Sequence, residues 1–146
     1  MHKPSRSRFV LLFLITLILL SCAGIYNIPP IELKDPKVGS QLQEDGHIVG
    51  AQEIPADTST IYFEAYLDVP STSIIMLEYR WYYEDELLYS YTGRHSRGYL
   101  TAALEVDPVK TPRLPAGVYA VQVWFVNTML AEVPFKVQEH AAPADT

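Results

Sequence analysis

The chain has 146 residues, of which 49% are hydrophobic and 12% aromatic, and its formal net charge is −6. A length of this order favours one domain with a single core. Phosphate binding depends on clustered Lys and Arg, so the acidic balance argues against nucleic acid as a partner. The sequence contains one cysteine, which excludes an internal disulfide.

The first 21 residues have the three parts of an export signal. Residues 1–8 carry three basic residues and no acid, and residues 9–20 are apolar apart from Thr16. Ser21 is the small residue that a cleavage site needs. The apolar stretch is shorter than the run of about 20 residues that a membrane-spanning helix requires. We therefore predict a signal peptide over residues 1–21.

The only cysteine, Cys22, follows this run directly. The tetrapeptide Leu19-Leu20-Ser21-Cys22 resembles the lipobox of bacterial lipoproteins, which implies cleavage before Cys22 and attachment of lipid to it. The alternative is an ordinary signal peptide with a coincidental cysteine. The resemblance predicts a protein anchored by lipid in a bacterial cell envelope. By similarity to lipoprotein sorting signals, Ala23 and Gly24 in place of an Asp favour the outer membrane.

Residues 22–46 contain three prolines, scattered charges and no sustained period. We expect a flexible tether here, which could extend to Pro55, with Ile48 and Val49 as a possible short edge strand. Loss of residues 1–21 would leave 8 basic against 17 acidic residues, a net charge of −9. A solvated acidic surface is the simplest interpretation of this charge.

Residues 47–138 have a dominant hydrophobic period of two, which predicts strands and no helix. Polar or proline-containing segments separate the strands, including Glu84-Asp85-Glu86. Pro134 has no N–H and predicts an edge or a bulge in the last strand. We expect an all-β antiparallel sandwich of about seven strands, followed by a disordered tail over residues 139–146. The predicted strands cover residues 60–67, 75–83, 87–92, 99–106, 118–125 and 129–137.

The segment Leu114-Pro115-Ala116-Gly117-Val118-Tyr119 begins a pattern that continues through alternating apolar residues to Val137. Over residues 58–138 it resembles the end of bacterial immunoglobulin-like modules. The resemblance implies a buried Trp81 and a tyrosine corner at Tyr119, whose hydroxyl bonds back to the chain. The chain departs from antibody-type domains because it lacks their disulfide pair.

No motif for catalysis, a cofactor or a metal emerges from the sequence. His47, His95 and His140 have no neighbours at metal-ligand spacing, and no nucleophile elbow or phosphate-binding loop is present. Glu84-Asp85-Glu86 lacks the spaced oxygen ligands of a calcium loop. We therefore expect a protein that is not an enzyme.

Two groups of residues are candidates for binding. If Trp81 and Tyr119 point inward, the strand period sends alternate residues to an outer face of the types enriched at protein interfaces. That predicted face comprises Arg80, Tyr82, Tyr89, Tyr91, Gln122 and Trp124, and a covered face or a register shifted by one residue is the alternative. The second group is a possible anion-binding loop of Arg94, His95 and Arg97, for which a solvated connection is the alternative.

We expect a lipid-anchored interaction module that docks onto another protein or assembly of the cell envelope. The alternative is a lipoprotein that binds a small ligand or glycan and serves a transporter or enzyme. A flat Tyr/Trp/Arg patch would favour the first function, whereas an enclosed Tyr-lined pocket would favour the second. The sequence leaves the oligomeric state open.

Overall fold

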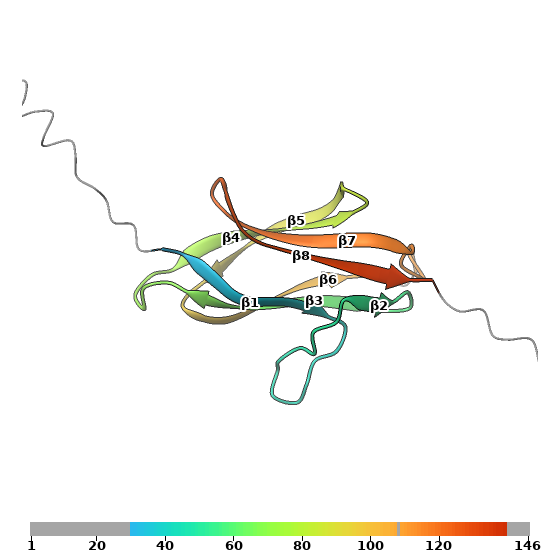
Figure 1. Ribbon diagram of the computed structural model, residues 1–146, viewed down its shortest axis with the longest axis horizontal. Coiled ribbons are helices and arrows are strands. Elements are labelled where there is room, and N and C mark those ends of the chain that lie inside the picture. Colours follow the sequence, from blue (N-terminus) through green and yellow to red (C-terminus); the bar gives the residue numbers. More distant parts are fainter. Residues whose placement is uncertain (1–29, 108, 140–146) are drawn as a thin grey trace, which may run out of the picture.

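The computed structural model of the chain describes residues 30–107 and 109–139, and all its regular elements are strands. Two sheets pack face to face (Figure 1). The smaller sheet has the strand order β1-β3-β6 and the larger has the order β2-β8-β7-β4-β5. The strands are β1 (Glu32–Gly39), β2 (Glu53–Pro55), β3 (Thr60–Asp68), β4 (Ile75–Tyr83), β5 (Glu86–His95), β6 (Gly98–Glu105), β7 (Gly117–Phe125) and β8 (Thr128–Gln138).

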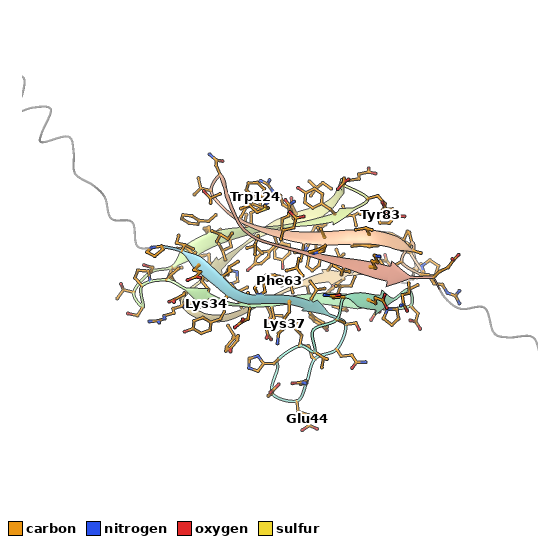
Figure 2. The ribbon with its side chains drawn as sticks, viewed as in Figure 1. Lys34, Lys37, Glu44, Phe63, Tyr83 and Trp124 are labelled. Carbon is orange, nitrogen blue, oxygen red and sulfur yellow. The ribbon has the colours of Figure 1, made fainter. Side chains whose placement is uncertain are left out.

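The predicted all-β sandwich is confirmed, with the alternating residues of both sheets meeting in one core. Figure 2 shows Phe63 of the smaller sheet between the two layers. Trp81 is buried, as the sequence predicts, and the Tyr119 hydroxyl donates a hydrogen bond to the Pro115 carbonyl at 3.0 Å. That bond is the predicted tyrosine corner. The largest fully buried side chains include Trp81, Tyr79, Tyr119, Phe63, Ile54, Ile61, Leu67 and Leu77.

The six predicted strands appear as β3 to β8, with end positions that differ by up to three residues. Pro134 lies opposite Ala120 of β7 on one side. On its other side β8 is unpaired at Pro134 among the described residues, because β2 pairs with β8 only from Lys136 to Gln138. The last strand is therefore an edge at Pro134, as predicted. The pairing of β2 with β8 is parallel, which departs from the expected purely antiparallel arrangement.

The predicted tether is wrong for residues 30–46, because β1 pairs with β3 as an edge strand of the smaller sheet. The reason is a bulge between Lys34 and Lys37, where Asp35 has a φ of 52°. Leu33 and Val38 are five positions apart, so a regular strand would place them on opposite faces. The bulge turns both into the core. The folded domain thus begins well before residue 47.

A loop between β1 and β2 projects from the smaller sheet (Figure 1). Leu42 and Ile48 form an isolated antiparallel bridge in it, so the strand expected at Ile48 and Val49 is reduced to that bridge. Gly39 lies where the loop returns, and a Cβ there would come within 2.0 Å of the Val49 carbonyl oxygen. Only glycine permits this close backbone approach.

The predicted signal peptide, Cys22 and the tail from residue 140 onward lie outside the described residues. Within residues 30–107 and 109–139, no helix has the length and apolar character needed to cross a membrane.

Candidate functional site

Four of the six predicted face residues share the outer surface of the larger sheet. Arg80 and Tyr82 lie on β4, opposite Gln122 and Ala120 of β7, while Trp124 follows two positions after Gln122. We call Arg80, Tyr82, Gln122 and Trp124 the tryptophan face. Figure 2 shows Trp124 on the side of the larger sheet that is turned away from Phe63.

Arg80 organises the tryptophan face. Its guanidinium donates two hydrogen bonds of 2.8 Å to the Glu78 carboxylate and lies 4.5 Å from the centre of the Trp124 ring. The Trp124 indole N–H donates to the Gln122 side-chain oxygen at 3.0 Å. These contacts hold the flat groups in fixed orientations while their polar atoms remain partly exposed. The arrangement suits stacking and hydrogen bonding with a protein surface.

Tyr89 and Tyr91 do not belong to this face, which corrects the prediction. They lie opposite Trp81 and Tyr79, and residues directly opposite one another project to the same side of a sheet. Both tyrosines therefore point toward the inner side. The cause is a register shift after the Glu86–Tyr83 and Leu87–Tyr82 pairs, which inserts Leu88 as an extra residue. A regular ladder would have put Tyr89 and Tyr91 on the outer side, as expected.

The predicted anion-binding loop is not assembled as a cluster. β5 extends to His95, and alternation sends the neighbouring Arg94 to the opposite side of the strand. His95 Nε2 lies 2.8 Å from the Tyr79 hydroxyl, and burial lowers the pKa of His95. Arg97 forms an ion pair with Asp68 at 3.4 Å. His95 and Arg97 thus have separate partners, Arg94 lies on the other side of the strand, and the three residues do not converge on one anion.

The smaller sheet carries a buried charge cluster that sequence reasoning missed. Glu64 of β3 is 1% exposed, although its side chain points away from the core. Lys37 Nζ lies 2.9 Å from its Oε1, and His47 Nδ1 lies 3.1 Å from its Oε2. The Ile48 backbone N–H donates to Oε2 at 3.1 Å. We call Lys37, His47, Ile48 and Glu64 the glutamate cluster.

Opposing effects act on the pKa of Glu64. Burial alone would raise this pKa, but Lys37, His47 and the Ile48 N–H together outweigh burial and hold it below its ordinary value. The carboxylate therefore remains charged and ties the projecting loop to β1 and β3. The ring of His47 also packs edge-on against Tyr99, with ring centres 4.6 Å apart. The partners come from β1 and from a loop at least 16 residues away, so no local spacing in the sequence could reveal them.

A groove opens between the free edges of β5 and β6. It has a volume of about 610 Å³ and is open to solvent rather than enclosed. The Ala103 N–H donates to the Tyr91 hydroxyl at 3.2 Å across its floor, while Tyr89 and Leu88 remain half-exposed. We call this the edge groove, which is lined by Leu88, Tyr89, Tyr91, Ala103, Leu104 and Glu105.

The described residues contain no group of three or more His, Cys, Asp or Glu side chains placed to hold a metal ion. His47 and Glu64 are adjacent, but the third member of their cluster is Lys37, a cation. The glutamate cluster is thus suited to fastening a loop rather than to binding a cation.

Comparison with solved structures identifies the class of fold. An immunoglobulin-like protein from Pseudomonas aeruginosa superposes with a TM-score of 0.56 at 13% identity, covering 77% of this chain and 99% of that one. An alkylpurine DNA glycosylase from Pseudomonas fluorescens superposes with a TM-score of 0.49 at 12% identity, covering 75% of this chain and 30% of that one. The superposition on the immunoglobulin-like protein, together with the two packed sheets, identifies the domain as an immunoglobulin-like β-sandwich. No family model and no curated protein sequence matches the chain.

Proposed function

We propose that the chain is a lipid-anchored, non-catalytic interaction module of the bacterial cell envelope. The observation that carries the proposal is Cys22, the only cysteine in the sequence, placed at the lipobox position directly after a short apolar run. Cleavage before Cys22 and its acylation would leave the sandwich joined to the membrane by residues 23–29. Ala23 and Gly24 favour the outer membrane. Two acyl chains or more give stable anchoring.

The tryptophan face supports the part of the proposal that concerns a protein partner. Its side chains form a flat, partly exposed patch in which Arg80 lies over Trp124. Trp, Tyr and Arg are the residue types that contribute most to protein interfaces. The chain's acidic charge opposes nucleic acid as a partner. A flat patch of this kind is better suited to binding the surface of another envelope protein than to enclosing a small ligand.

The second candidate function, binding of a small ligand or glycan, draws on the edge groove. Its volume of about 610 Å³ and its two tyrosines are within the range of small-molecule sites. The groove is open, however, and an open site buries less of a small ligand than the enclosed cavities such ligands prefer. The interaction module therefore remains the better-supported function.

Labelling and capture test the two parts of the proposal separately. Cells fed an alkyne fatty acid should label the wild-type chain, whereas Cys22→Ser should lose the label and leave the membrane fraction. Chemical crosslinking should then join the wild-type chain to an envelope protein, and the double change Tyr82→Ala with Trp124→Ala should weaken that crosslink. Tyr99→Ala, an exposed aromatic of the other sheet, is the matched control. Equal crosslinking by all three chains would exclude the tryptophan face.

A further inference from the structure

The edge groove lies where the smaller sheet ends. This sheet has three strands against the five of its partner, and β6 is its last strand on that side. β5 is the last strand of the larger sheet, and the bond from Ala103 to Tyr91 shows that these two edges meet. Tyr89 faces inward but is 50% exposed, so the described part of the chain leaves half of it uncovered. The space is one in which a further strand beside β6 would lie.

The backbone of β6 provides the hydrogen-bonding groups for such a strand. Within residues 30–107 and 109–139, β6 pairs only with β3. The Ala103 N–H reaches Tyr91 and therefore points away from β3. In an antiparallel ladder this direction alternates, so the N–H groups of Thr101 and Glu105 also point toward the groove. A peptide aligned there would meet donors at the spacing of a strand.

We propose that an extended segment of the partner protein adds to β6 as a strand and fills the edge groove. This inference deepens the proposed interaction function and rests on it. Alternate side chains of the segment would be apolar and pack on Tyr89, Leu88 and Leu104, which line the groove. Main-chain hydrogen bonds to β6 supply affinity, and the apolar contacts set the register.

Charge favours a basic residue in the bound segment. Among the residues that the structure describes, Glu105 is the only charged one that lines the groove, and it is exposed. The whole chain is acidic, with a net charge of −6, so a second copy of the chain is electrostatically opposed. A segment preceding β1 is also poorly placed, because β1 and β6 are opposite edges of the smaller sheet. A segment with one Lys or Arg beside Glu105 fits best.

Tyr91 acts as an internal competitor for this edge. Its hydroxyl accepts the Ala103 N–H that a bound strand would need. Such occupation protects the edge from unspecific pairing. Tyr91→Phe removes the competing oxygen and keeps the ring, so it should bind the segment at least as tightly as the wild type. Ala103→Pro removes the N–H itself and should abolish the central hydrogen bond.

Selection from a displayed library of nonapeptides tests the proposal without knowledge of the partner. The target is the full-length chain in detergent, and the counter-target is its Ala103→Pro variant. Peptides enriched on the wild type should alternate apolar residues and carry Lys or Arg. An enriched peptide should bind Tyr91→Phe at least as well, and Tyr89→Asp or Ala103→Pro roughly tenfold more weakly or worse. Circular dichroism checks that each variant is folded. If Ala103→Pro does not fold, the comparison between the wild type and Tyr89→Asp decides the result.

Hydrogen exchange locates the bound peptide. The amides of Thr101, Ala103 and Glu105 should become protected, and Val118→Ala, a change at a half-exposed residue of β7, should leave the affinity unchanged. Failure to enrich peptides on the wild type over both variants, or protection confined to the tryptophan face, would overturn strand addition at β6. The result is independent of the fatty-acid label on Cys22. Failure here would therefore leave the lipid anchor and the tryptophan face to be judged by their own tests.

Discussion

The outer faces of the two sheets use ion pairs in different ways. On the smaller sheet, the Glu64 side chain is 2% exposed and its partners Lys37 and His47 come from β1 and a loop. On the larger sheet, Arg80 and Glu78 are two residues apart on β4 and both about 30% exposed. The first arrangement fixes a loop to the fold, whereas the second leaves a charged and aromatic surface available. The contrast indicates that one face stabilises the domain and leaves the other available for the proposed partner.

The largest expected effect is the loss of the buried carboxylate. Glu64→Ala removes the acceptor of the Ile48 N–H and leaves the Lys37 ammonium without its partner. Breaking a buried pair costs about 3 kcal/mol, and the part-exposed lysine moderates this by reaching solvent. Glu78→Ala, the matched change on the other sheet, should cost about 1 kcal/mol or less. Urea denaturation measures both, and equal losses would contradict the contrast between the faces.

The second prediction concerns acid. The pKa of Glu64 is lowered in the folded chain from an ordinary value of 4.5, so the unfolded chain binds the proton at higher pH. The stabilisation that this carboxylate provides is therefore complete above about pH 4.5 and is lost as pH falls through the lowered pKa. Glu64→Gln should reduce the slope of unfolding free energy against pH below that value.

Asp68 and Glu78 also have lowered pKa values. Both carboxylates are still present in Glu64→Gln, so their contributions to the pH dependence of stability cancel when this variant is compared with the wild type. Denaturation midpoints measured between pH 3 and pH 7 check the prediction. Parallel curves for the wild type and Glu64→Gln would show that the cluster does not contribute to acid sensitivity.

Arg80→Ala should have a small effect on stability, comparable with that of Glu78→Ala. This change removes a partly exposed ion pair and the contact with the Trp124 ring. Each is worth between about 0.2 and 1 kcal/mol at an exposed site, so the total loss should stay near 1 kcal/mol. The yield of crosslinks to the proposed envelope partner should fall strongly, although the variant stays nearly as stable as the wild type. A large loss of stability with unchanged crosslinking would reverse the roles assigned to the two faces.

The sequence predicted the regular strands well because alternation is a local signal. The strands β3 to β8, the buried Trp81 and the hydroxyl bond of Tyr119 all follow from residue spacing and the fold resemblance. Each failure traces to a break in alternation or to a distant contact. The bulge at Asp35 concealed β1, and the extra residue Leu88 reversed Tyr89 and Tyr91. Alternation with Phe63 and Ala65 places Glu64 on an outer face, but its burial depends on a loop whose path local spacing does not encode.

The central claim, that Cys22 carries the lipid of an envelope module, is tested most directly by intact mass measurement. The chain is purified from bacterial membranes, and its mass and N-terminal fragments are determined. We predict that residues 1–21 are missing and that Cys22 is the first residue, with a mass increase that matches attached acyl chains. A mature chain that begins at another residue, or an unmodified Cys22, would contradict the account.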